Sequence, residues 1–363
     1  MSVADDRYRI ERHGVLMSPR SDDPLEAWGV LNPASARGRD GELYLFPRLV
    51  AEGNVSRVGR AIVRFDDAGV PVGVERVGLA LEPDELWESN VRTRGVEDPR
   101  ITYVPHLDRY VMAYAAYGPY SARVALAVSA DLERWERLGP AAFAYEPALR
   151  ADLNLYPNKD AFLFPEPVAD PAGEPAFALL HRPTWDLAWA KEGEAVYLPD
   201  GVEDPRPGMW MSYAPLEEVE QDIRALTRLR HHRPVATPEQ PWEALKIGGG
   251  TPPILTADGW CTVFHGVSGR QLHGVDHQPH VRYVAGVMVH ALDDVARVVH
   301  RSAEPLLEPD ALEEREGVVN NVVFPTAIEP TEGGAWVFYG MADARIGVAR
   351  LSVGPSDSEE VAQ

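Results

Sequence analysis

Short apolar runs recur along the whole chain, separated by Gly, Pro and charged residues. Their length of four to six residues and their content of β-branched and aromatic side chains are typical of strands. The runs are 43–46, 61–64, 110–115, 124–128, 176–180, 261–264, 285–289 and 335–339. The gaps between them rarely leave room for a crossover helix, so the pattern argues against a parallel α/β sheet and predicts an all-β chain.

One hexapeptide occurs twice. Gly95–Arg100 (GVEDPR) recurs letter for letter at Gly201–Arg206, and a Tyr-containing, strand-like run follows each copy. Repeated antiparallel hairpins over roughly 340 residues fit about five four-stranded blades. We therefore predict a five-bladed β-propeller that forms a single domain over residues 1–353, followed by an acidic, disordered tail at 354–363. A double β-sandwich is the structural alternative.

The segment 215–230 has helical rather than strand periodicity. Its apolar residues recur at three- or four-residue steps, with acidic residues early and basic residues late, as the helix dipole prefers. The apolar positions are Leu216, Val219, Ile223, Leu226 and Leu229. We predict one short amphipathic helix inserted between blades. Its apolar stripe is expected to pack within the chain, and packing against a second copy in a homo-oligomer is the alternative.

Composition narrows the choice of partners. The 363 residues are 45% hydrophobic and carry a net charge of -21, from 35 Lys and Arg against 56 Asp and Glu. This charge disfavours nucleic acid and anionic membranes as partners, although a local group of cations could still bind an anionic substrate. The single cysteine, Cys261, excludes a disulfide framework and is expected in the core. We see neither a signal peptide nor an apolar run of about 20 residues, and a reducing, cytoplasmic location fits best.

The first hexapeptide places two carboxylates side by side. Glu97 and Asp98 lie between a permissive Gly and Pro99, which disfavours a helical conformation for Asp98 and predicts an extended or turn conformation. Nearby guanidinium groups would keep Asp98 ionised, whereas burial or the neighbouring Glu97 would raise its pKa, as a catalytic acid requires. The alternative is a strand-end turn with surface ion pairs.

Further polar motifs follow in a fixed order. The Gly-rich stretch among them lacks the Gly-Lys-Ser/Thr ending of the phosphate-binding loop found in nucleotide-binding proteins. Its glycines are expected instead to let the backbone approach a ligand. The motifs are EDPRIT (97–102), NKDAFLFPE (158–166), HRP (181–183), WE and GGGTPPI (242–243 and 248–254), GW and FHG (259–260 and 264–266), VVFP (322–325) and YGMAD (339–343).

Together these motifs resemble glycoside hydrolase family 130, which contains inverting mannoside phosphorylases with a five-bladed propeller fold. The resemblance extends from about Gly29 to about Leu351. It implies that Asp98 is the single catalytic acid, acting on the glycosidic oxygen through the sugar's own 3-hydroxyl. It also implies a phosphate-binding set of Lys159, Arg182, His265 and Tyr283. These residue types suit phosphate, because Arg forks onto oxyanions, Lys supplies charge, and His and Tyr donate hydrogen bonds.

The resemblance implies a sugar-binding set as well: Asn32, Arg48, Asp160, Glu243 and Asp343. Glu243 follows a tryptophan, as the acceptor-side carboxylate of the family does. Taken singly, these residues could equally be loop and turn residues. Arg182 alone could be a surface ion-pair partner, His265 a core histidine and Tyr283 an ordinary strand aromatic.

Two features depart from the family pattern. Lys159 stands where several phosphorylases carry Arg, which keeps the charge but loses the bidentate grip. The segment 267–281 is long and contains His273, His277 and His280. A zinc site there lacks support from cysteines or a helical frame, so we expect no metal and interpret the segment as a loop over the acceptor side of the cleft.

The resulting hypothesis is inverting phosphorolysis of a β-mannoside, of the β-1,4-mannosyl-glucose or manno-oligosaccharide type, with inorganic phosphate as co-substrate and no other cofactor. Mannose as the donor sugar depends on the resemblance alone, and β-1,2 linkages remain open. The first rival is an inverting β-mannosidase, which needs a carboxylate to activate water; its candidates are Glu166, Glu203 and Glu243. The second rival is a non-catalytic carbohydrate-binding propeller.

Overall fold

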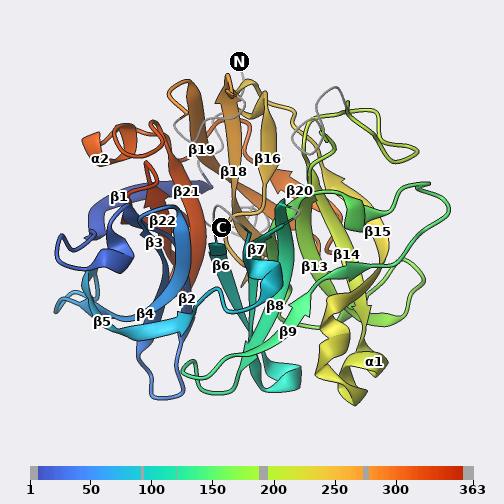
Figure 1. Cartoon of the computed structure of the whole chain (residues 1–363), viewed down its shortest axis with the longest axis horizontal. Helices are drawn as coiled ribbons and strands as arrows, with labels where there is room; N and C mark the ends of the chain where they lie inside the picture. Colours follow the sequence, from blue (N-terminus) through green and yellow to red (C-terminus); the bar gives the residue numbers. More distant parts are fainter. Residues whose placement is uncertain (1–6, 91–93, 120, 188–194, 273–277, 355–363) are drawn as a thin grey trace, which may run out of the picture.

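The computed structural model describes residues 7–90, 94–119, 121–187, 195–272 and 278–354. All eight predicted strand runs lie within strands of these ranges. The sheets form five blades, numbered in chain order from blade 1 at residues 29–81. In the view of Figure 1, blades 1 and 5 lie on one side and blade 3 lies on the other. The prediction of a five-bladed, all-β propeller is therefore confirmed.

Blades 1 and 2 are consecutive four-stranded meanders. The strands of blade 1 are β2 (Gly29–Arg37), β3 (Leu43–Ala51), β4 (Val55–Phe65) and β5 (Pro71–Leu81). Those of blade 2 are β6 (Arg94–Val104), β7 (Arg109–Gly118), β8 (Ser121–Ser129) and β9 (Glu136–Pro140). A short parallel pairing of β4 with β6 joins the two blades into one eight-stranded sheet.

Blades 3 and 4 each carry one or more extra short strands. Blade 3 contains β10 (Ala142–Phe143), β11 (Asn158–Leu163), β12 (Val168–Ala169), β13 (Pro175–Pro183), β14 (Met209–Pro215) and β15 (Arg228–Ala236). Blade 4 contains β16 (Lys246–Gly248), β17 (Ile254–Thr256), β18 (Gly259–Gly269), β19 (Val281–His290) and β20 (Val298–Arg301).

Blade 5 combines the two ends of the described chain. Its strands are β21 (Val323–Thr331), β22 (Gly334–Met341), β23 (Arg345–Val353) and β1 (Tyr8–Met17). β1 pairs antiparallel with β23 as the outermost strand, so the first strand of the chain completes the last blade. This pairing joins the two ends of the described chain in one sheet and so closes the ring of blades.

The predicted helix is present but shorter, and it lies inside one blade rather than between blades. α1 covers only Leu216–Gln221, after which Asp222 caps a 3₁₀ turn at Ile223–Thr227 and the chain continues into β15. Both elements therefore connect β14 to β15 of blade 3. A second short helix, α2 (Leu312–Arg315), precedes blade 5.

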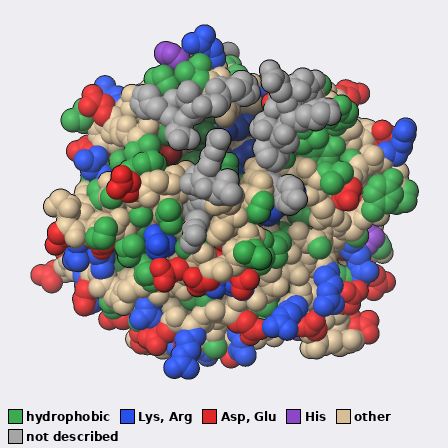
Figure 2. Space-filling model, viewed as in Figure 1, with side chains coloured by type: hydrophobic (Ala, Val, Ile, Leu, Met, Phe, Trp, Pro, Cys, Tyr) green, Lys and Arg blue, Asp and Glu red, His purple; other side chains and the backbone are tan. Residues whose placement is uncertain are grey.

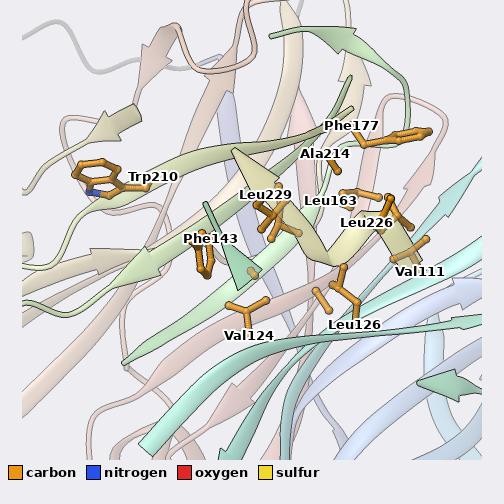
Figure 3. Packing of buried hydrophobic residues seen from close by; sticks show 14 of the residues in the cluster. Val111, Val124, Leu126, Phe143, Leu163, Phe177, Trp210, Ala214, Leu226 and Leu229 are labelled. Atoms are coloured by element: carbon orange, nitrogen blue, oxygen red, sulfur yellow. The ribbon is translucent and has the colours of Figure 1, made fainter. Parts of the chain in front are cut away.

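The apolar stripe of this segment packs within the chain, as expected. Leu226 and Leu229 lie in the cluster between blades 2 and 3, together with Val111 and Leu126 of blade 2 and Phe177 of blade 3 (Figure 3). Burial of such side chains contributes roughly 1.5–3 kcal/mol each. Cys261 is completely buried in another cluster, between blades 4 and 5, as predicted.

The second copy of the hexapeptide is not a structural repeat of the first. Gly95–Arg100 forms part of β6, the innermost strand of blade 2, whereas Gly201–Arg206 lies in the loop between β13 and β14. There Asp204 accepts from its own neighbour Arg206 at 2.7 Å. The repeat therefore led to the correct fold, although its two copies do not occupy equivalent positions in two blades.

Candidate functional site

The candidate site begins with a bulge in β6. The pairing with β7 shifts between Glu97 and Arg100, and Asp98 within this shift has a φ of 48°. The expectation of an extended or turn conformation is corrected, because Asp98 adopts the left-handed region. Asp and Asn occupy this region more readily than most residues, so an aspartate before Pro99 can turn its carboxylate out of the strand.

The Asp98 carboxylate is buried and receives three donors. Asn32 Nδ2 donates to Oδ1 at 2.8 Å, and Arg48 Nη1 donates to the same oxygen at 3.1 Å. Lys159 Nζ donates to Oδ2 at 3.3 Å. Burial by itself would raise the pKa of Asp98, but the charges of Lys159 and Arg48 outweigh it and hold the pKa well below its usual range. These contacts therefore keep Asp98 ionised.

Glu97 does not act on Asp98 as a free neighbouring charge. Arg48 places its two terminal nitrogens on the two adjacent carboxylates, with Nη2 at 2.9 Å from Glu97 Oε1. Burial raises the pKa of Glu97, and the Arg48 charge opposes this. Arg48 is thus a fork that orients both carboxylates and offsets part of their combined charge.

A second ionic cluster lies beside the first. Arg182 Nε donates to Asp160 Oδ2 at 2.7 Å, and His265 Nε2 lies 3.6 Å from the same oxygen. Among the described residues, neither of the buried ring nitrogens of His265 nor Asp160 Oδ1 has a hydrogen-bond partner. Burial lowers the pKa of His265 to about 3 despite the nearby Asp160, so its imidazole is neutral near pH 7. A buried, neutral imidazole without a partner is ready to bond a ligand.

Equivalent positions of several blades supply these groups. Leu31 pairs with Arg48 in blade 1, Lys159 with Arg182 in blade 3, and Gly248 with His265 in blade 4. Leu31 and Lys159 lie near the starts of the innermost strands β2 and β11, whereas Gly248 is the last residue of the three-residue strand β16. The propeller thereby gathers these side chains at one end of its axis.

The same left-handed conformation recurs in four predicted site residues. The φ angles of Asn32, Asp98, Asp160 and Asp343 are 40°, 48°, 56° and 52°, and the residues belong to blades 1, 2, 3 and 5. Register shifts interrupt the pairing at the first three. The short polar side chains that tolerate this backbone are therefore also the ones that reach the axis.

Two cavities meet at these residues. A pocket of about 130 Å³ is lined by Asn32, Arg48, Asp98 and Asp343, among others. A larger cleft of about 610 Å³ contains Asp160, Arg182, Lys246 and His265 in its lining. Lys159 and Tyr283 line both, so the two spaces adjoin. Figure 2, which has the same view as Figure 1, shows Lys and Arg side chains inside a recess of the surface.

Asp343 differs from Asp98 in its titration. Burial raises the pKa of Asp343 to about 6, although the charge of Arg48 opposes the shift. Two aspartates that line one pocket are thus separated in acidity by their surroundings. Of the two, Asp343 is the carboxyl group that changes its charge near neutral pH.

Comparison with known proteins assigns this arrangement to a family. The sequence profile of glycoside hydrolase family 130, described as β-1,4-mannooligosaccharide phosphorylase, matches residues 15–355. The chain belongs to glycoside hydrolase family 130. It is similar to a 1,2-β-oligomannan phosphorylase from Thermoanaerobacter sp. (strain X514), with 28% identity over 95% of this chain and 97% of the relative. A β-1,2-mannobiose phosphorylase from the same organism is 29% identical over 81% of this chain and 76% of the relative.

Solved structures agree with the fold of this family 130 protein. The β-1,2-mannobiose phosphorylase from Listeria innocua, in complex with β-1,2-mannobiose, superposes with a TM-score of 0.68. The match covers 98% of each chain at 21% identity. At this level of identity the likeness supports the propeller architecture.

The structure does not bring every predicted residue of the family 130 site together. Glu243 is completely buried at the end of a 3₁₀ turn, Pro241–Glu243, and does not line either cavity. Its Oε2 accepts from the backbone nitrogens of Glu239 and Gln240 and from Arg301 Nη2, the last at 2.6 Å. This carboxylate caps a turn and pairs with a strand of its own blade, instead of facing the acceptor side of the cleft.

Glu243 belongs to a structural pattern that recurs in four blades. A buried glutamate at the third position of a short helical turn before the innermost strand pairs with an arginine on the outermost strand of the same blade. The pairs are Glu26 with Arg76, Glu88 with Arg137, Glu243 with Arg301, and Glu314 with Arg12. In the sequence, Arg12, Arg76 and Arg301 each precede the next blade's glutamate by 12 to 14 positions, a period that motif reasoning missed.

Sequence reasoning also missed two cations. Arg100 is buried and donates from Nη1 to the Asp98 carbonyl, from Nη2 to the Gly249 carbonyl and from Nε to the Gly250 carbonyl, each at 2.9 Å. It therefore braces the bulge of blade 2 against the Gly-rich turn of blade 4. Lys246 lines the larger cleft, with Nζ 5.5 Å from the centroid of the Tyr283 ring. Its position next to the Gly-rich turn was the available signal.

The glycines of this turn approach the protein's own side chains. A Cβ on Gly248 would lie 2.5 Å from Asp160 Oδ2 and 2.6 Å from His265 Cε1, and one on Gly249 would lie 2.6 Å from the Asp160 carbonyl. The absence of side chains thus lets blade 4 close against blade 3. The ligand approach that we expected of these glycines is replaced by this packing.

Two alternatives concern parts of the chain with limited description. His273 and His277 of the predicted metal alternative lie outside the described residues, as do residues 355–363 of the tail predicted at 354–363. Within the described ranges, no group of three or more His, Cys, Asp and Glu could hold a metal ion. None of the helices described there has the length and apolar content that crossing a membrane requires.

Proposed function

We propose that this family 130 protein cleaves β-mannosides by phosphorolysis with inversion, and releases α-mannose 1-phosphate and an acceptor sugar. The observation that carries the proposal is that the pocket of the buried Asp98 carboxylate adjoins a cationic cleft. Lys159 lines both spaces. The curated relatives, which are named as mannoside phosphorylases, support it. Inorganic phosphate is the proposed co-substrate, and no other cofactor is required.

Phosphate is proposed to bind between Lys159, Arg182, His265 and Tyr283, with Lys246 as an additional charge. Lys159 and Lys246 provide positive charge, and Arg182, whose Nε donates to Asp160, is proposed to direct Nη2 at an oxygen of the phosphate. The partnerless imidazole of His265 supplies a hydrogen bond. Phosphate is already a nucleophile, so this side of the sugar needs cations and no general base.

Asp98 is proposed as the proton donor. Its proton passes through the sugar's 3-hydroxyl to the departing oxygen, while a phosphate oxygen bonds to the anomeric carbon and the glycosidic bond breaks. Lys159 and Arg48 keep Asp98 ionised. A bound phosphate dianion offsets the charge of Lys159 and adds a nearby negative charge, and both effects raise the pKa of Asp98. Phosphate binding thereby prepares the acid that the reaction uses.

The finer specificity is part of the proposal. The family profile carries a β-1,4-mannooligosaccharide description, whereas the two curated relatives above act on β-1,2-linked substrates. Both linkages are therefore included as substrates to be tested. The contacts of Asn32, Arg48, Asp160 and Asp343 with sugar hydroxyls are proposed from their positions around the pocket.

A hydrolytic mechanism receives less support from the site. Of the three glutamates considered as a base for water, Glu166 and Glu203 are exposed and Glu243 is completely buried with Arg301. None of them lines the Asp98 pocket or the cationic cleft. The cations that face Asp98 suit phosphate better than water as the attacking group.

The test is product analysis with β-1,2- and β-1,4-mannobiose, with and without inorganic phosphate. We expect a sugar 1-phosphate only when phosphate is present. The variant Asp98→Asn keeps a residue that tolerates a positive φ but cannot donate the proton, so turnover should fall about 10²- to 10⁴-fold.

The second copy of the hexapeptide provides the matched control. Asp204→Asn changes the same residue in the same six-residue sequence. Asp204 itself lines neither cavity, although its partner Arg206 lines the cationic cleft, so turnover should change by less than about twofold. Free mannose formed at equal rates with and without phosphate would overturn the phosphorylase proposal. Full activity of Asp98→Asn would overturn the assignment of the acid.

A further inference from the structure

A third cavity adjoins the Asp98 pocket on the side of blades 1 and 5. It has a volume of about 160 Å³ and shares Arg48, Val319 and Asp343 with the lining of the Asp98 pocket. Among the residues that the structure describes, it shares no lining residue with the cationic cleft. The three spaces therefore follow one another, with Asp98 in the middle space, the cations beyond one end and this cavity beyond the other.

The lining of the third cavity has the composition of a sugar subsite. Trp28 is 41% exposed and lines the cavity, so part of its indole ring is accessible to a ligand there. Leu31 and Val50 extend the apolar surface, and Arg48 and Asp343 add hydrogen-bonding groups at the boundary with the Asp98 pocket. An aromatic face with a few polar groups at its edge suits a pyranose ring, whose C–H face is apolar and whose rim carries hydroxyls.

The direction of the reaction decides which sugar lies there. In an inverting displacement the nucleophile and the leaving group stand on opposite faces of the ring that reacts. With phosphate at the cationic end and the donor sugar beside Asp98, the leaving sugar is directed toward the third cavity. This argument depends on the proposed phosphorolysis for the placement of phosphate.

We infer that Trp28 is the platform of the acceptor subsite, on which the pyranose ring of the leaving sugar stacks, and that the cavity formed with Val319 and Asp343 determines acceptor specificity. This differs from the expectation that the loop at 267–281 covers the acceptor. Gln271 of that loop lines the Asp98 pocket and the cationic cleft, and does not line the Trp28 cavity.

The test measures the reverse reaction from α-mannose 1-phosphate with mannose, mannobiose and glucose as acceptors. Trp28→Ala should raise the KM for the best acceptor about tenfold or more. The KM for α-mannose 1-phosphate should remain within about twofold, because the donor end is untouched. Trp28→Phe keeps an aromatic face and should restore most of the acceptor affinity.

Tyr103 is the matched control. It is a similarly exposed aromatic residue, at 40%, and it lines none of the three cavities. Tyr103→Ala should leave the acceptor KM unchanged. An unchanged acceptor KM in Trp28→Ala, or an equal increase in both variants, would overturn the inference.

Calorimetric titration of each variant with mannobiose separates this inference from the proposed function. If wild-type protein shows no phosphate-dependent reaction, the proposed function fails, and the binding measurement still decides the role of Trp28. Binding weakened about tenfold in Trp28→Ala and recovered in Trp28→Phe supports the platform. Equal binding by wild type and Trp28→Ala excludes it.

Discussion

At the scale of the residue, the site depends on aspartates and an asparagine in a backbone conformation that few side chains accept. Asn32, Asp98, Asp160 and Asp343 all have positive φ angles. Their surroundings then divide their roles. Lys159 and Arg48 keep Asp98 ionised, while Asp343 at the edge of the same pocket retains its proton to a higher pH because burial dominates.

This difference predicts how stability depends on pH. The pKa of Asp343 is about 6 in the folded protein against 3.8 in the unfolded chain. Between these values the folded state holds a proton that the unfolded state has lost, so the contribution of Asp343 to stability falls as the pH rises from about 4 to 6 and stays low above it. Asp343→Asn removes this loss and keeps a residue that tolerates positive φ.

We therefore expect Asp343→Asn to raise the free energy of unfolding by about 1–2 kcal/mol at pH 7.5 and to change it little at pH 4. Urea titrations at the two pH values measure the effect. The same change in stability at both pH values would show that the charge of Asp343 is not its cause.

At the scale of the element, the short turns before the innermost strands are held by buried glutamate–arginine pairs. Glu243 and Glu88 end equivalent turns in blades 4 and 2, and each accepts from two backbone nitrogens as well as from its arginine. A tryptophan precedes both glutamates. A Trp-Glu pair in this chain is thus a signal of the blade turn, and its resemblance to an acceptor-side carboxylate has a structural explanation.

Glu243→Gln should lower stability without affecting sugar binding. The amide keeps the shape but loses the charge that compensates Arg301, whose side chain is only 9% exposed, so a loss of about 3 kcal/mol is expected. Thermal unfolding and KM for the sugar substrate are measured together. Glu88→Gln, the equivalent change in blade 2, should give a similar loss. A large increase in KM with unchanged stability in Glu243→Gln would restore its role as a sugar contact.

At the scale of the whole molecule, one strand closes the ring of blades. Arg12 on β1 donates from Nε to Glu314 Oε1 at 2.9 Å, and Tyr339 on β22 donates to the same oxygen at 2.9 Å. Glu314 itself is completely buried. The pair thus fastens the first strand of the chain to the last blade, and the site at the axis depends on that closure because blades 1 and 5 both line the Asp98 pocket.

Arg12→Ala should therefore destabilise the entire propeller by about 1–3 kcal/mol, because it leaves the Glu314 charge buried without its cation. Arg12 is partly exposed, which keeps the expected effect below that of a fully buried pair. Urea unfolding followed by tryptophan fluorescence measures it. Arg9→Ala, on an exposed position of the same strand, is the control and should change stability by less than about 0.5 kcal/mol. Equal effects of the two changes would show that the Arg12–Glu314 pair makes no specific contribution to stability.

The sequence by itself determined the fold class, because the alternation of short apolar runs with turns is a local property that each strand carries alone. It also determined the chemical types of the central site, since Asp98, Lys159, Arg182 and His265 stand in recognisable motifs. The ends of the helix predicted at 215–230 could not be determined from the sequence. Asp222 stops it after six residues, and the following apolar positions serve a 3₁₀ turn and β15 equally well.

Only the tertiary structure decided which of these residues meet. Two identical hexapeptides became an innermost strand and a loop, because the pairing partners, and not the local sequence, determine whether such a segment joins a sheet. Glu243 turned inward to Arg301 while Lys246, three positions later, reached the cleft. Such outcomes depend on contacts between residues that are far apart in the chain. A buried charge takes the partner that the assembled blades offer, and the motif around it does not reveal that partner.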